Sequence, residues 1–232
     1  MLNQIKGLHH VTSMAASARQ NNSFFTDTLG LRRVKKTVNF DAPDVYHLYY
    51  GDEVGTPGSV MTYFPFPGMP RGRDGTGEVG TTVFAVPQGS LGFWKDRFVQ
   101  SAVKVESEDE AFGEKRIHFR GPDGDSFALV EVKDDPRAPW LHDGIDADHA
   151  IRGFHSVSMR LRDEGATSEL LKYMGYQKLD AKDGVTRLIM PEGNGAGVID
   201  LETLPSVGRN QQGAGSVHHV AFAVDNREKQ LE

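Results

Sequence analysis

The chain has 232 residues, 38% of them hydrophobic, which is enough for one or two packed domains. Its formal net charge of −6 gives no basic field for nucleic acid or an anionic membrane, so we expect a small-molecule partner and no nucleic acid. The absence of cysteine excludes disulfides and thiol chemistry and leaves His, Asp and Glu as metal ligands. No apolar run approaches the roughly 20 residues of a membrane span, so we expect no membrane partner and a cytoplasmic location.

Four strand-like segments along the chain resemble one another, which indicates an internal repeat. Gly7, Gly80 and Gly153 begin the first three at an even spacing of 73 residues, and Ser216 begins the fourth 63 residues later. A repeat of about 70 residues is too long for a solenoid unit and suits a small supersecondary module. The four segments read GLHHVT, GTTVF, GFHSVS and SVHHVA.

The first repeat predicts a module of one strand, one helix and three more strands. A strand over 6–14 comes first, and residues 21–29 then place apolar side chains at helical spacing before Gly30. Segments rich in β-branched and aromatic residues follow and are divided by turn residues. These three predicted strands cover 31–40, 45–50 and 59–64.

The later repeats follow the same β-α-β-β-β order. The second predicts a helix at 90–99 and a last strand at 127–132, and the third predicts them at 168–174 and 198–201. The sequence therefore predicts an α+β fold of tandem modules that form open, barrel-like cavities. The modules cover 1–70, 71–133, 151–205 and 206–232, with 134–150 as a surface linker. The fourth module has room for one strand and the start of a helix, so we expect the chain to be a piece of a longer protein.

Side chains alternate between the two faces of a strand, so aligned columns of the repeats separate core from cavity. One column is apolar in every module, and we expect it to pack against the module's own helix. That column holds Val11, Val83, Val157 and Val220. The preceding column should face the concave side. It holds His10, Thr82, Ser156 and His219.

His10 and His219 are the candidate metal ligands, because His recurs at one structural position where the other modules carry small polar residues. If both bind one ion, module one must pair with module four, and module two with module three. Two imidazoles and one carboxylate are the pattern of non-haem Fe(II) oxygen chemistry. At the position on the last strand where a carboxylate ligand would lie, module one has Thr62 and module two has Ala128. Module three has Asp200 there, which should face the second cavity or the module interface. Glu131 is expected to be solvated.

Motifs in a fixed order resemble the ring-cleaving dioxygenases of the vicinal oxygen chelate superfamily, and most of all their hydroquinone-type branch. The motifs are LHHVT at 8–12, YHLYY at 46–50, GTPG at 55–58, RGFHS at 152–156 and VHHVAF at 217–222. The resemblance implies Fe(II), with Mn(II) or another divalent metal as alternatives, held by His10, by His219 and by a Glu on the last strand of module four. That strand has no counterpart here, so we expect the chain as given to lack the third ligand and to be inactive.

The same resemblance implies an aromatic diol and O₂ as the substrates. It implies catalytic roles for His9 and His218, although each is equally open to a structural, hydrogen-bonded role at a strand start. Thr12, on the same face as His10, and His47 are the candidate substrate-binding residues.

Two other functions stay open on the sequence. A metal-dependent isomerase or lyase of the glyoxalase kind shares the modules but needs a carboxylate where module one has Thr62. A metal-free small-molecule-binding protein of the same superfamily would not need the two aligned His. A homo-oligomer is compatible with the sequence.

Overall fold

The computed structural model describes residues 2–142 and 144–231. Its first module begins with a strand, a short helix that continues into a π-helical turn, and three further strands. These elements are β1 (Ile5–Ala15), α1 (Ala18–Ser23), η1 (Phe24–Thr28), β2 (Arg32–Val38), β3 (Tyr46–Gly51) and β4 (Val60–Pro65). The helix begins three residues earlier than the sequence predicts, because the Ser17 hydroxyl accepts a hydrogen bond from the Gln20 amide and caps it.

The second and third modules repeat this order, and a fourth begins after them. Module two contains β5 (Glu78–Pro87), α2 (Leu91–Gln100), β6 (Val105–Ala111), β7 (Glu114–Arg120) and β8 (Ser126–Val132). Module three contains β9 (Gly153–Leu161), α3 (Gly165–Tyr173), β10 (Gln177–Lys182), β11 (Val185–Ile189) and β12 (Val198–Thr203). Module four contributes β13 (Val217–Val224) and α4 (Arg227–Gln230). Among the described residues, no helix is long and apolar enough to cross a membrane.

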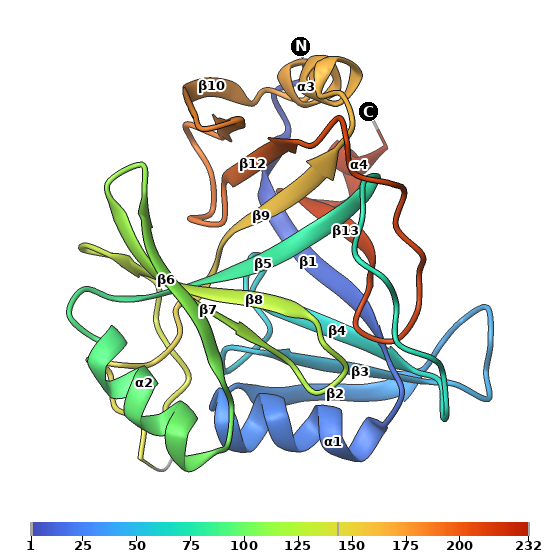
Figure 1. Cartoon of the computed structure of the whole chain (residues 1–232), viewed down its shortest axis with the longest axis vertical. Coiled ribbons are helices and arrows are strands. Elements are labelled where there is room, and N and C mark those ends of the chain that lie inside the picture. The colour runs from blue at the N-terminus through green and yellow to red at the C-terminus, as the bar shows by residue number, and fades with distance from the viewer. Residues whose placement is uncertain (1, 143, 232) are drawn as a thin grey trace.

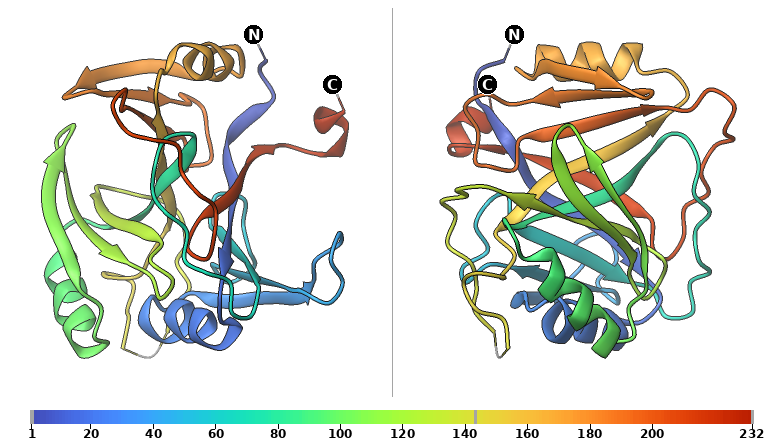
Figure 2. Two further views of the ribbon diagram at one scale, coloured as in Figure 1. Left: turned by 45° about the vertical axis from the view of Figure 1, so that its right-hand side comes forward. Right: turned by 60° about the vertical axis from the view of Figure 1, so that its left-hand side comes forward.

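Two curled sheets carry the fold, and together they confirm the predicted α+β class (Figures 1 and 2). The five-stranded sheet has the order β13-β1-β4-β3-β2, and the eight-stranded sheet has the order β10-β11-β12-β9-β5-β8-β7-β6. Within a module the first strand runs parallel to the last, while between modules β1 pairs antiparallel with β13 and β5 with β9. Each sheet is thus shared by two modules. We call its concave side the first cup in the five-stranded sheet and the second cup in the eight-stranded sheet.

The main core lies on the convex faces of the sheets, under the helices. Adjacent aromatic rings of η1 pack on both sheets there: Phe25 stacks on Tyr50 of β3 at a centroid distance of 4.8 Å, and Phe24 stacks on Phe127 of β8 at 6.0 Å. The second of these contacts joins modules one and two. Full burial of each such ring stabilises the fold by about 1.5–3 kcal/mol.

The register of β5 differs by one residue from the sequence expectation. Val83 pairs with Ser156, while Thr82 pairs with Val157. Val83 is separate from the main core and packs with Ala128 and Val130 on the concave side. The prediction that Val83 packs against its own helix, and that Thr82 faces the cavity, is therefore wrong. A bulge between Val79 and Thr82 shifts the pairing, and a slip of one residue exchanges the two faces of a strand.

Candidate metal centre

Two neighbouring antiparallel strands bring four His side chains together. β1 carries His9 and His10, β13 carries His218 and His219, and the pairing sets His219 opposite Thr12 and His10 opposite Ala221. The two strands are separated by 209 positions at these residues, so only the fold brings them together. Hollows lie on both sides of the cluster: one of about 750 Å³ borders His9 and His10, and one of about 290 Å³ borders His218 and His219.

The four imidazoles form a continuous chain of ring nitrogens. The Nε2 atoms of His10 and His219 lie 3.1 Å apart at its centre. Nδ1 of His10 lies 3.0 Å from Nδ1 of His9, and Nδ1 of His219 lies 2.8 Å from Nδ1 of His218. Each central ring therefore directs Nε2 at the other and keeps its Nδ1 occupied by a neighbour, which fixes the orientation of both rings.

Burial favours the neutral form of three of these imidazoles, those of His9, His10 and His219. Burial, followed by the neighbouring His9, His219 and His47, lowers the pKa of His10 to about 4. Burial also lowers the pKa of His219, with a smaller contribution from His218, and lowers the pKa of His9. A metal ligand must be the neutral imidazole, so this environment favours the binding form.

A second hydrogen-bonded chain leads away from the His cluster. The Thr12 hydroxyl lies 3.0 Å from Nε2 of His219 and shares a 2.7 Å hydrogen bond with the Thr62 hydroxyl. The Thr62 hydroxyl lies 3.0 Å from Nε2 of His47, whose Nδ1 lies 2.7 Å from the Tyr49 hydroxyl. Burial, followed by His219 and Lys35, lowers the pKa of His47 to about 4.

The two central nitrogens fit a divalent metal ion. Two imidazole nitrogens about 2.1 Å from one ion, at angles of about 90–109°, would lie roughly 3.0–3.4 Å apart. The 3.1 Å between the Nε2 atoms of His10 and His219 falls in this range. Within residues 2–142 and 144–231, no group of three His, Asp or Glu side chains could hold a metal. The described residues thus supply a two-imidazole site, and Thr62 stands where a last-strand carboxylate of module one would be.

The structure brings together five of the six candidate site residues: His9, His10, Thr12, His218 and His219. His47 joins them through the Thr62 hydroxyl. Sequence reasoning missed Thr62 as a link and left the role of Tyr49 and Phe64 open. The centroid of the Phe64 ring lies 4.3 Å from that of the His47 ring and 5.7 Å from that of the His218 ring. Phe64 lies two residues after Thr62 on β4, so the two side chains point to the same face of the sheet. Because β4 pairs in parallel with β1, this position could have indicated that Phe64 lies near the His cluster.

Comparison with known proteins places the chain in a family. Residues 7–129 match the model of the Glyoxalase/Bleomycin resistance protein/Dioxygenase superfamily. A Bacillus subtilis (strain 168) protein named "Putative ring-cleaving dioxygenase MhqE" is 42% identical over 97% of this chain and 73% of its own length. The chlorohydroquinone/hydroquinone 1,2-dioxygenase of Sphingobium indicum is 34% identical over 95% of this chain and 71% of its own length.

Solved structures agree on the fold. The crystal structure of a "putative dioxygenase" from Bacillus subtilis superimposes with a TM-score of 0.94 at 36% identity, and covers 99% of this chain and 73% of that one. Glyoxalase I from Zea mays superimposes with a TM-score of 0.71 at 15% identity, which supports the fold alone. The chain belongs to the Glyoxalase/Bleomycin resistance protein/Dioxygenase superfamily, and its relatives there are named as ring-cleaving dioxygenases.

Proposed function

We propose that this chain belongs to an Fe(II)-dependent dioxygenase that opens the ring of a hydroquinone or a catechol-like diol with O₂. The observation that supports it best is the 3.1 Å approach of Nε2 of His10 to Nε2 of His219, from strands at opposite ends of the chain. The hydroquinone dioxygenase among the relatives favours hydroquinones as the first substrates to test.

His10 and His219 would hold the metal through Nε2. When bound, Fe(II) supplies a Lewis acid for the diol oxygen and an electron path between the diol and O₂. By the resemblance, a Glu on the last strand of a fourth module is the third ligand. That strand is not among these 232 residues.

His9 and His218 are assigned the proton transfers. A diol must lose a hydroxyl proton to bind as a phenolate, and a neutral imidazole near working pH is the usual acceptor. Each of these rings contacts a metal-facing His through Nδ1, so it sits at the edge of the reaction site. Burial lowers the pKa of His9, which favours the unprotonated form that accepts a proton.

Thr12 and His47 are assigned the positioning of the diol. The Thr12 hydroxyl lies beside Nε2 of His219, where it can donate to a diol oxygen. His47 is linked to Thr12 through the Thr62 hydroxyl, and its ring packs with the rings of Tyr49 and Phe64. An aromatic wall suits a flat substrate ring because offset stacking stabilises it.

Metal content and O₂ uptake test the proposal together. The complete protein, with the third ligand that the resemblance implies, is reconstituted with Fe(II) under anaerobic conditions, its bound iron is measured, and O₂ uptake is followed with hydroquinones and catechols. We expect His10→Ala and His219→Ala each to lose both iron and uptake. His149→Ala is the matched control, because His149 is bonded to Asp146 on the linker. Bound iron without uptake for any diol contradicts the dioxygenase, and iron retained in His10→Ala contradicts the metal centre.

A further inference from the structure

A second cavity lies between modules two and three, in the second cup and away from the four clustered His. Its volume is about 400 Å³, within the range of small-molecule binding sites in proteins. Strands from both modules contribute to its walls: β5, β6 and β7 on one side, and β9, β11 and β12 on the other. Residues central to it are Thr81, Val83, Phe112, His118, Ser158 and Asp200.

The second cup carries hydroxyls where the first carries metal-facing imidazoles. In the first cup, Thr12 lies beside Thr62 on the parallel strand and opposite His219. In the second, Ser158 lies beside Asp200 on the parallel strand, and the Thr81 amide donates to the Ser158 hydroxyl. Thr81 thus takes the place of His219. By the aligned motifs, Ser156 takes the place of His10.

Asp200 occupies the last-strand position but is already neutralised. The Arg187 guanidinium donates to both of its carboxylate oxygens at 2.7 Å, and both side chains are buried. A bidentate pair of this kind is a strong, geometrically specific contact. With two hydroxyls and a neutralised carboxylate, the second cup has the wrong donors for a metal and suits an organic molecule.

Val83 gives the cavity an apolar lining residue that is itself packed against Ala128 and Val130, and the β6–β7 hairpin lies at another side. Val83, Ala128 and Val130 form a small cluster separate from the main core. The hairpin turns at Phe112 and Gly113, both at positive φ, as a tight two-residue hairpin requires. Phe112 lies over the Arg187 guanidinium at 4.2 Å.

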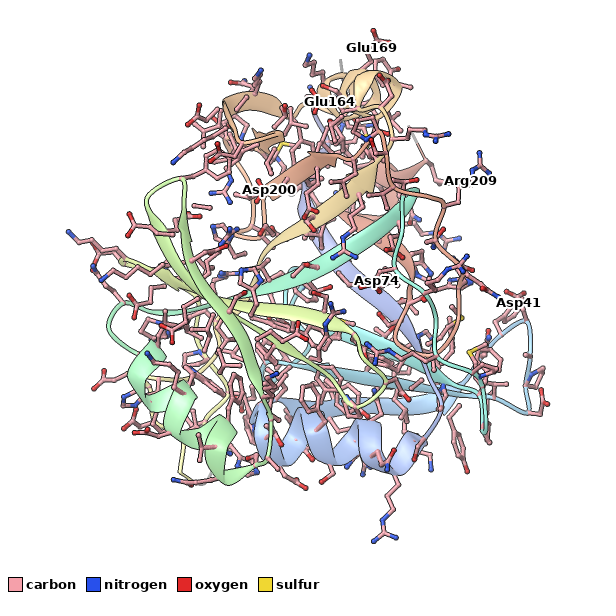
Figure 3. The ribbon with its side chains drawn as sticks, viewed as in Figure 1. Asp41, Asp74, Glu164, Glu169, Asp200 and Arg209 are labelled. Atoms are coloured by element: carbon pink, nitrogen blue, oxygen red, sulfur yellow. The ribbon has the colours of Figure 1, made fainter. Side chains whose placement is uncertain are left out.

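An ion pair and a hydrogen bond hold this hairpin against module three. Glu114 accepts from Arg187 at 2.5 Å and pairs with Nε2 of His155 at 3.0 Å. These contacts lower the pKa of Glu114 to about 2, against the opposing effect of burial. Figure 3 labels Asp200 on β12, across from the hairpin. Val83 and Phe112 both line the cavity, so a flat ligand there would meet apolar side chains from β5 and from the hairpin turn.

The charge of the lining selects among flat ligands. Acidic side chains outnumber basic ones: Asp109, Glu110, Asp183, Asp200 and Glu202 against Arg116 and Lys182. Arg116 is committed to Asp109 at 2.8 and 3.0 Å, and Asp200 is committed to Arg187. Glu202 lies 3.6 Å from the Arg160 guanidinium, which leaves Glu110 and Asp183 with no ion pair among the described residues. The acidic excess disfavours an anionic ligand and favours one that donates hydrogen bonds or carries a positive charge.

We propose that the cavity between modules two and three binds a small aromatic molecule that carries hydroxyl or ammonium donors and no negative charge, independently of the metal centre. This site needs neither His10 nor His219, so it can be tested on the metal-free chain.

Three phenols separate charge from shape: tyramine and 4-hydroxybenzoate, which match in size and differ in charge, and the smaller, neutral hydroquinone. Each is titrated into the isotope-labelled, metal-free chain and followed by two-dimensional NMR. We expect saturable shifts at the amides of Val83, Ala111 and Ser158, with tyramine binding at least about tenfold more tightly than 4-hydroxybenzoate. No saturable binding of any probe, or equal binding of tyramine and 4-hydroxybenzoate, overturns the proposal.

Variants then locate the site. Ala111→Trp, half-buried at the end of β6, should fill the cavity and weaken tyramine and hydroquinone alike by about tenfold or more. Glu202→Gln should weaken tyramine more than hydroquinone. Glu169→Gln, an exposed position on α3, is the charge-matched control and should change neither (Figure 3).

The His10→Ala/His219→Ala double variant separates this site from the metal centre. We expect it to bind all three probes as the parent does. Loss of binding in the double variant, or unchanged binding in both Ala111→Trp and Glu202→Gln, overturns the proposal.

Discussion

Asp125 is a buried carboxyl whose ionisation should make stability depend on pH. Its side chain is 4% exposed, and the Tyr63 hydroxyl donates to its Oδ1 at 2.5 Å. Burial raises its pKa to about 6, although the Tyr63 hydrogen bond opposes the shift. The folded chain thus holds this proton more tightly than the unfolded chain, where the pKa of Asp is about 3.9. The contribution stabilises the fold below about pH 4 and is lost as the pH rises through about 6.

Asp125→Asn should therefore gain stability relative to the parent as the pH rises. A pKa difference of about two units corresponds to about 3 kcal/mol of unfolding free energy between about pH 4 and about pH 7. The Asn side-chain oxygen can still accept from Tyr63, so the hydrogen bond is retained. Urea unfolding of both proteins at the two pH values measures the difference. Asp96→Asn, an exposed carboxyl on α2, is the control. If the difference in unfolding free energy between the parent and Asp125→Asn is the same at both pH values, the raised pKa of Asp125 is contradicted.

Local sequence singled out residues that lie together in the fold where the signal repeats, and missed contacts between residues far apart in the sequence. His10 and His219 could be selected because one motif recurs at the start of β1 and β13. The link through Thr62 could not, because it depends on the hydroxyls of β1 and β4 meeting across a parallel pairing. Arg187 likewise gave no signal: its partners Asp200 and Glu114 lie 13 and 73 positions away.

At the scale of elements, the N-terminal cap of α2 comes from a side chain on strand β8. Oε1 of Glu131, on β8, accepts from the amides of Gly89 at 2.9 Å and Leu91 at 3.3 Å. The Ser90 side chain makes no capping hydrogen bond of its own. The expectation that Glu131 is solvated is therefore wrong. Its carboxylate meets the amides at the start of α2, which have no acceptor within the helix.

Glu131→Ala should destabilise the fold by about 1 kcal/mol, because the helix amides lose their acceptor. Glu131→Gln should cost less, because its amide oxygen can still accept while the charge is lost. Urea unfolding near neutral pH gives both values. If the Ala variant is no less stable than the Gln variant, Glu131 does not act as the cap.

The pairing of β5 explains why the predicted facing of its side chains was wrong by one residue. The even spacing of Gly7, Gly80 and Gly153 is a count along the chain, and the strands β1, β5 and β9 each contain one of these glycines. The facing of side chains depends on pairing, and the bulge near Val79 changes the pairing without changing the count. Sequence periodicity therefore predicts element order better than it predicts which face a side chain occupies.

At the scale of the whole molecule, the candidate metal centre joins the first and last modules of the chain. β1 and β13 meet along one antiparallel pairing, and His10 and His219 contribute one nitrogen each to the same point. An ion bound there would hold the two strands together in the folded chain, while the unfolded chain keeps these His residues 209 positions apart. Binding to the folded state alone stabilises it by mass action.

Fe(II) or Mn(II) added under anaerobic conditions should therefore raise the melting temperature of the chain. At about 100 times the dissociation constant the gain is about 2.7 kcal/mol. That is a rise of roughly 5–10 °C for a chain of this size. His10→Ala and His219→Ala should each abolish the rise, and a chelator should reverse it in the parent. His149→Ala should melt with the parent's full metal-dependent rise, since its ring bonds to Asp146 far from the cluster. An equal rise in the parent and in both cluster variants would place the bound metal elsewhere, because a site between β1 and β13 requires both nitrogens.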